Sequence, residues 1–163
     1  MRNKIDQRKL YAQQLFVATS DIHEATDACQ LLIENVRNKN HPLYRPLLTA
    51  IIICYSRPFT KNKGYGGLKG KWHKFKSKEL QDVHETLLDM RKKVIAHSDS
   101  DVCKVNIEMK DTPFGKRVPS ISVVSQSLPL NVFPAVLRTC RDIGDRLELE
   151  ALNKEDLLSD GGH

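Results

Sequence analysis

The fold is decided by residues 11–36, whose sequence is YAQQLFVATSDIHEATDACQLLIENV. Apolar residues recur there at alternating spacings of four and three, at Tyr11, Leu15, Ala18, Ile22, Ala25, Cys29, Leu32 and Val36. This spacing lines up one face of an α-helix. Ser20 and Asp21 could cap a second helix, but the apolar face continues past them unbroken. We therefore predict one long helix over residues 4–38, ended by the polar sequence NKNHP at 38–42.

Three further helices are predicted outward from this one. Residues 43–56 are apolar on every side in their second half, and their length favours a buried helix over a strand. Ser77 is a suitable N-cap for a helix that runs to residue 97. Its core-facing positions are Leu80, Val83, Leu87, Met90, Val94 and His97. The last helix is predicted to begin near Asn131 and to bury Val132, Val136, Cys140, Ile143, Leu147 and Ala151, with Pro134 tolerated in its first turn.

Between the last two helices the apolar period changes to two, which is typical of strands. This pattern predicts a two-stranded hairpin over residues 102–125, with a turn at 111–115. An isolated hairpin is only marginally stable, so we expect it to lie against the helices or against a partner chain. The fold class is therefore mainly α: a helical bundle of about four helices with a β-hairpin inserted before the last helix. We expect a single domain over residues 1–163, with a frayed tail at 157–163.

The composition is that of an ordinary globular domain. The 163 residues are 40% hydrophobic and 28% charged, and the net charge is +6. The longest strongly apolar run, 47–55, is far shorter than the ~20 residues of a membrane span, and no apolar signal segment follows the N-terminal charges, so we expect a cytoplasmic protein. The four cysteines form no CxxC pair and are predicted to be buried free thiols, with no metal and no cofactor.

Three common enzyme signatures are absent. Gly70-Lys71 lacks the upstream glycine of a Walker A loop, and Trp72 stands where its hydroxyl residue belongs. His23-Glu24 and His84-Glu85 lack the second histidine of a zinc peptidase helix. No G-x-S-x-G elbow is present either.

The segment with the clearest chemical content ends the third predicted helix. In RKKVIAH, Arg91 and His97 are separated by five residues, and Ser98-Asp99 follows. The segment resembles the R-x(4–6)-H signature of the HEPN superfamily of helical-bundle domains. This resemblance covers the helix closely and the order of helices loosely. Two positions depart from the family pattern: Lys92 follows the arginine where active members often have Asn, Asp or His, and Asp99 replaces the tyrosine of the subgroup regulated by nucleotidylation.

The resemblance implies a metal-independent endoribonuclease, often a toxin or an antiviral protein, with an antitoxin or another protein as partner. Members dimerise so that two copies of the motif form one site. His97 would act as general base or acid on the RNA 2′-hydroxyl, and Arg91 would bind the phosphate and stabilise its developing charge. Lys92 would be a further phosphate contact. Two alternatives remain: a non-catalytic module of the same fold that binds nucleic acid or protein, with His97 as a core residue, and a purely structural dimerisation domain.

A second candidate surface is the basic loop, which we define as residues 57–76. Residues 57–78 contain eight basic residues and no acidic one. Lysines interleaved with aromatic residues are typical of surfaces that bind single-stranded RNA. The predicted substrate contacts are Lys69, Lys71, Trp72, Lys74 and Lys76. The alternative is a solvated loop whose aromatic residues pin it to the helices, and this is the expected role of Phe59.

Overall fold

The computed structural model describes residues 4–61, 66–95, 104–111, 115, 117–124 and 127–154. Within these residues the α-helices are α1 (Lys4–Asn35), α2 (Tyr44–Ser56), α3 (Lys78–Ile95) and α4 (Phe133–Leu152). Short 3-10 helices lie at Arg57–Phe59, Gly70–His73 and Leu130–Val132, and the strands are β1 (Lys104–Asp111) and β2 (Arg117–Val124). The prediction of a mainly helical bundle is confirmed.

Helix α1 is continuous across Ser20 and Asp21, as its apolar stripe predicts. The stripe residues from Leu15 to Val36 are all buried, with exposed fractions of 4% or less. The helix ends at Asn35, three residues before the predicted end. The chain then turns through residues 37–43, where the side chain of Asn38 accepts a hydrogen bond from the backbone N–H of Asn40 at 3.0 Å. This local side-chain bond competes with helix continuation.

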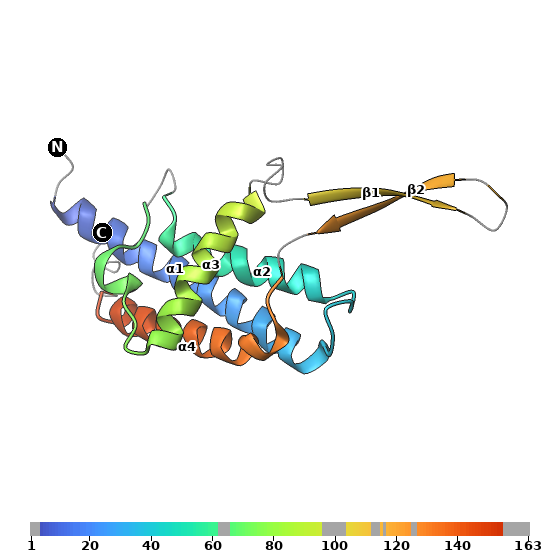
Figure 1. Cartoon of the computed structure of the whole chain (residues 1–163). Coiled ribbons are helices and arrows are strands. Elements are labelled where there is room, and N and C mark those ends of the chain that lie inside the picture. The colour runs from blue at the N-terminus through green and yellow to red at the C-terminus, as the bar shows by residue number, and fades with distance from the viewer. Residues whose placement is uncertain are drawn as a thin grey trace.

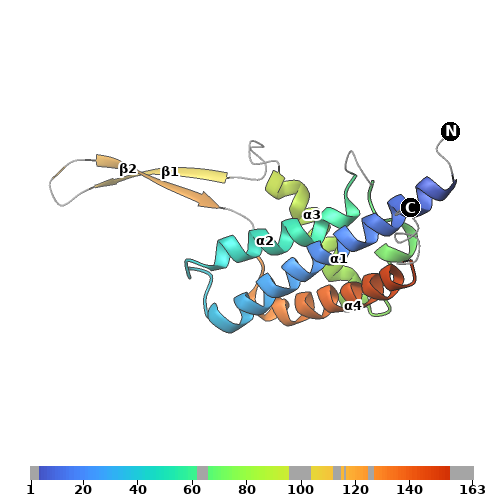
Figure 2. The same ribbon diagram turned by 180° about the vertical axis from the view of Figure 1, so that it is seen from behind.

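The four helices enclose one core (Figures 1 and 2). Helix α1 packs along α2 and α4, and α3 packs against the same two helices. Residues 43–56 form a helix, as predicted, although Ile51 to Ile53 are β-branched and favour strands. Ile51, Ile52 and Tyr55 are at most 1% exposed, so burial on the inner face outweighs that local preference.

Strands β1 and β2 pair antiparallel, with Lys104 opposite Val124 and Asp111 opposite Arg117. This pair extends beyond the ends of the helices instead of packing across them, as both views show (Figures 1 and 2). The register sets Ile107 opposite Ile121. Residues 112–114 of the predicted turn lie outside the described residues, as does the predicted frayed tail.

The thiols of Cys29, Cys54 and Cys140 are free and buried, as predicted, and Cys103 lies outside the described residues. Burial raises the pKa of the Cys29 thiol to about 12 and that of Cys54 to about 11, so neither is a thiolate at neutral pH. None of the described helices combines the length and apolarity needed to cross a membrane.

Candidate functional site

Arg91 lies near the C-terminal end of α3 and is half-buried. It is four residues after Leu87, which is fully buried, so the two share the inner side of the helix. The Nε of Arg91 is buried and has no hydrogen-bond partner, which is true of no other buried side-chain nitrogen or oxygen in the described part of the chain. A buried donor without a partner costs about 1–3 kcal/mol, and such a cost marks Arg91 as a candidate functional residue.

Of the other predicted site residues in this segment, the structure describes Lys92 but not His97. Lys92 is exposed and therefore accessible to a polyanion. His97 lies outside the described residues, together with Ser98 and Asp99. The relative geometry of Arg91 and His97 is thus an expectation from the sequence alone.

The basic loop is held against the helices by its aromatic residues. Phe59 is 9% exposed and Trp72 only 3%, and Phe75 packs against the same core. The expected packing role of Phe59 is confirmed. A substrate contact by Trp72 stays a prediction, although with 3% of the residue exposed its ring offers no open face on which a base could stack. The physical reason is that the Trp72 side chain gains more from burial beside α4 than it would on an exposed loop.

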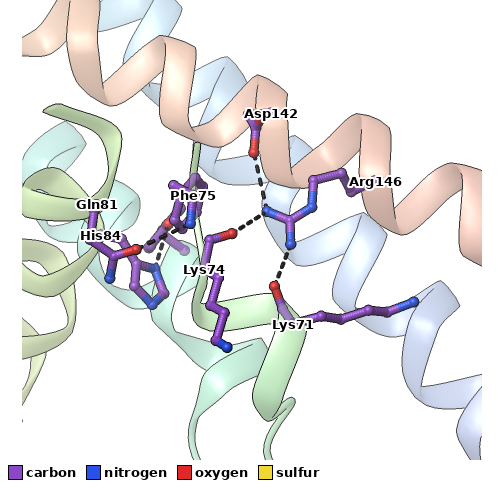
Figure 3. A network of polar contacts seen from close by, with 8 residues as sticks. Lys71, Lys74, Phe75, Gln81, His84, Asp142 and Arg146 are labelled. Atoms are coloured by element: carbon purple, nitrogen blue, oxygen red, sulfur yellow. Dashed lines mark hydrogen bonds and ion pairs between the residues drawn. The ribbon is translucent and has the colours of Figure 1, made fainter. Parts of the chain in front are cut away.

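Arg146 of α4 fixes the loop backbone from the other side (Figure 3). Its guanidinium donates hydrogen bonds to the carbonyl of Lys74 at 3.1 Å and to the carbonyl of Lys71. The same group pairs with Asp142 at 3.2 Å and lies 5.6 Å from the ring centroid of Trp72. Arginine thereby satisfies two loop carbonyls that face α4, which a lysine could not do with the same fixed fork.

The lysine side chains remain on the outside of the loop. Lys69, Lys74 and Lys76 are exposed and form no ion pair within the described residues, whereas Lys71 pairs with Glu150 at 2.9 Å. Figure 3 shows the side chains of Lys71 and Lys74 extending away from Arg146, although their carbonyls point toward it. The described part of the loop thus buries its aromatic rings, with Nζ of Lys71 4.9 Å from the ring centroid of Trp72, and leaves Lys69, Lys74 and Lys76 exposed. That arrangement suits phosphate binding better than base stacking.

A chain of hydrogen bonds that the sequence does not predict joins the basic loop to α2 and α3. The Tyr55 hydroxyl is 2.8 Å from Nδ1 of His84, whose Nε2 is 3.1 Å from Nδ1 of His73. Nε2 of His73 is 2.8 Å from the carbonyl oxygen of Leu68. A carbonyl only accepts, so Nε2 of His73 carries a proton, its Nδ1 accepts from His84, and His84 Nδ1 accepts from Tyr55. One arrangement of protons satisfies the whole chain with both histidines neutral.

His84 is 1% exposed and surrounded by rings. The centroids of Phe59, Phe75 and His73 lie 4.8, 5.1 and 5.1 Å from its own. Burial, and secondarily the neighbouring His73, lower the pKa of His84 from 6.5 to about 4. The available signal in the sequence is its position: His84 is four residues after Leu80 and three before Leu87, on the apolar face of the helix.

Comparisons with known proteins add no family to this picture, because no protein-family model, no curated protein and no solved structure matches the chain. Among the described residues, no group of three or more His, Cys, Asp and Glu side chains could hold a metal ion. The assignment of function therefore rests on the residues themselves.

Proposed function

We propose that the protein is a HEPN-like, metal-independent endoribonuclease, acting as a toxin or in antiviral defence. The observation that carries the proposal is Arg91, whose buried Nε lacks a hydrogen-bond partner on the helix that bears the R-x5-H segment. A phosphate oxygen is the acceptor that a guanidinium fork matches best. The mainly helical bundle is compatible with the resemblance.

The chemistry needs only side chains. His97 removes the proton of the 2′-hydroxyl, the 2′-oxygen attacks the adjacent phosphorus, and the bond to the 5′-oxygen breaks. The leaving 5′-oxygen takes up a proton, which His97, protonated in the first step, can return. The products are a 2′,3′-cyclic phosphate and a 5′-hydroxyl. Arg91 stabilises the negative charge that builds on the phosphate oxygens.

The spacing of the motif along a helix agrees with a dimeric site. Six positions along an α-helix separate Arg91 and His97 by about 120° around its axis. A single straight helix therefore directs them to different sides, and a second copy of the motif supplies the missing partner. We further propose that residues 102–125 form a hairpin arm that contacts the partner chain, since the strand pair extends away from the helices.

The second candidate is a non-catalytic module of the same fold that binds RNA or protein. The observation in its favour is the basic loop, whose exposed lysines Lys69, Lys74 and Lys76 have no ion-pair partners among the described residues. Such a surface binds RNA without any catalytic group.

The proposed activity is tested with purified protein, mixed RNA and EDTA. The wild-type protein is expected to leave products that end in a 2′,3′-cyclic phosphate, and His97→Ala is expected to cleave at least ~100-fold more slowly. The matched control is His23→Ala, because His23 is exposed and its contact with Glu148 lies at the surface. Intact RNA after incubation with wild-type protein, or cleavage only after metal is added, would replace the enzyme with the binding module.

RNA affinity is expected to depend on the basic loop. Replacing Lys69, Lys71, Lys74 and Lys76 with glutamine should weaken binding of single-stranded RNA and flatten its dependence on salt. Each lost phosphate contact should lower the slope of log K against log salt by about 0.7, because fewer counterions are released. The measurement is fluorescence anisotropy of a labelled RNA between about 50 and 200 mM salt.

The matched control for this series removes exposed basic charges elsewhere. Lys39 and Arg45 lie before and at the start of α2, and both are exposed. The double variant Lys39→Gln, Arg45→Gln should retain the wild-type slope. The opposite result would be that the double variant lowers the slope of log K against log salt by as much per removed charge as the loop variant does. In that case RNA binding depends on the net charge of the protein, and the loop is not the RNA surface.

A further inference from the structure

A cavity of about 340 Å³ lies between α1 and the described part of the basic loop. Tyr11 and Gln14 of α1 form one side, and Leu68, Lys69, Lys71 and Trp72 of the loop form the other. The volume falls within the range of about 300–1,000 Å³ that is usual for small-molecule sites. The cavity shares no residue with the end of α3 that carries Arg91.

The walls of this cavity are fixed without a ligand. The Gln14 side-chain amide donates to the carbonyl of Gly66 at 3.1 Å, and the Leu68 N–H donates to the carbonyl of Pro58 at 2.8 Å. A Cβ at Gly67 would lie 2.6 Å from the carbonyl oxygen of Phe59, so the loop backbone approaches as closely as only glycine permits. A preformed site loses little entropy when a ligand binds.

The charge around the cavity is positive and incompletely compensated. Lys69 forms no ion pair within the described part of the chain, while Lys71 pairs with Glu150. Arg8, one helical turn before Tyr11, adds an exposed cation on the same side of α1. The opening therefore favours an anion, and the ammonium group of Lys69, which lines the cavity, can pair with it.

The interior offers an aromatic surface. Tyr11 is half-buried and lines the cavity, whereas Trp72 borders it with only 3% of the residue exposed, so Tyr11 is the ring that a base can contact. A cation at the rim and an aromatic wall inside are the two features that bind a nucleotide, through its phosphate and its base respectively.

We propose that this cavity binds a single nucleotide, with its phosphate at Lys69 and its base against Tyr11. The proposal rests on the proposed function only in taking RNA as the expected source of that nucleotide. A free nucleoside monophosphate has the same chemistry and is the alternative source.

The test is titration of the full chain with adenosine 5′-monophosphate at low salt, followed by the fluorescence of Trp72, the sole tryptophan. Binding is expected to saturate and to change the Trp72 emission. Adenosine alone and inorganic phosphate alone should each bind roughly 10-fold more weakly or worse, because each makes one of the two contacts. No saturable change up to millimolar nucleotide, or equal binding of all three ligands, would overturn the proposal.

Two variants and a control locate the site. Lys69→Gln and Tyr11→Leu should each weaken nucleotide binding by roughly 10-fold, the loss expected for a phosphate or a stacking contact. Arg45→Gln, an exposed arginine at the start of α2, should bind as the wild type does. Because Tyr11 is half-buried, far-UV circular dichroism is used to check that Tyr11→Leu is folded. Lys69 is exposed, so Lys69→Gln should not disturb the packing of the core. Wild-type affinity in Lys69→Gln would overturn the assignment.

Competition separates the two sources of the nucleotide. If a short single-stranded RNA displaces adenosine 5′-monophosphate, RNA is the ligand of the cavity. If RNA does not displace it, the ligand is the free nucleotide. Nucleotide binding is read from the emission of Trp72, which borders the cavity, and not from the cleavage of RNA. Loss of cleavage and loss of nucleotide binding are therefore distinguishable, and the cavity can hold a nucleotide even if no RNA is cleaved.

Discussion

Arg91→Met is expected to lower the rate of RNA cleavage by roughly 100-fold or more, because loss of one group that stabilises transition-state charge has an effect of this size. Methionine keeps much of the apolar stem of the half-buried side chain and removes only the guanidinium. The variant should also be at least as stable as the wild type, since the buried Nε without a partner disappears. Single-turnover cleavage and chemical denaturation measure the two effects.

A conservative variant refines this prediction. Arg91→Lys keeps the positive charge but loses the planar fork, so cleavage is expected to fall between that of the wild type and that of Arg91→Met. Arg45→Met is the control for loss of an arginine on an exposed surface. If Arg91→Lys and Arg91→Met both cleave at the wild-type rate, the guanidinium takes no part in the reaction.

Mixing variants tests whether the site is shared between two chains. If Arg91 of one chain acts with His97 of the other, a heterodimer of Arg91→Met and His97→Ala retains one complete site. Cleavage should then reappear when the two inactive proteins are mixed and allowed to exchange subunits. Co-purification of an untagged variant with an affinity-tagged one verifies that subunits have exchanged. No recovery of cleavage in such samples would mean that both groups act within one chain, or that both copies of each are needed.

The helices are the part of this protein that the sequence predicts well. The apolar stripe of α1 has a regular spacing, and each of its residues from Leu15 onward is buried where the spacing places it. The start of α4 is two residues later than predicted, at Phe133, because residues 130–132 form a 3-10 turn that the periodicity does not distinguish. Apolar spacing predicts which face of a helix is buried, whereas the first and last residues of the helix are determined by local hydrogen bonds.

The basic loop shows why the candidate site is harder to predict. Its interleaved lysines and aromatic residues are compatible with either an open RNA surface or a pinned loop, and the choice depends on Arg146, more than seventy residues away in the chain. The hydrogen-bonded pair of His73 and His84 likewise joins a loop to a helix through a contact that no spacing rule encodes. The catalytic role of His97 stays a prediction, since this residue lies outside the described residues.

Acid is expected to destabilise the protein through His84. In the folded chain its pKa is lowered to about 4, against 6.5 when unperturbed, chiefly by burial. Between these values the unfolded chain binds a proton that the folded chain resists, so stability falls as pH falls from about 6.5 to about 4. The contribution is fully present above pH 6.5. A pKa lowered from 6.5 to about 4 corresponds to roughly 3 kcal/mol of stability.

Burial is the main reason that His84 resists the proton, and its hydrogen bond with Tyr55 is also disturbed by protonation. Protonated His84 carries an N–H on both ring nitrogens, so Nδ1 can no longer accept from the Tyr55 hydroxyl. Tyr55 is fully buried, and His84 is the partner that its hydroxyl has in the described structure. Arg146 opposes the new charge and Glu85 favours it, while Asp142 is held by Arg146. The desolvation of the imidazolium outweighs the attraction of Glu85.

His84→Gln isolates this effect, because glutamine can accept from Tyr55 and donate to His73 but does not titrate. The free energy of unfolding, measured by denaturant titration at several pH values from 7.5 to 4, should fall less steeply for His84→Gln than for the wild type, even if the variant is less stable at pH 7.5. His41→Gln, at a histidine outside this network, should keep the wild-type slope.

Trp72 belongs to the same loop as His73, so its emission should shift toward that of a solvated indole in acid before far-UV circular dichroism reports loss of helix. Parallel slopes for the wild type and His84→Gln would show that the acid sensitivity comes from other groups and that the histidine pair does not hold the loop in place.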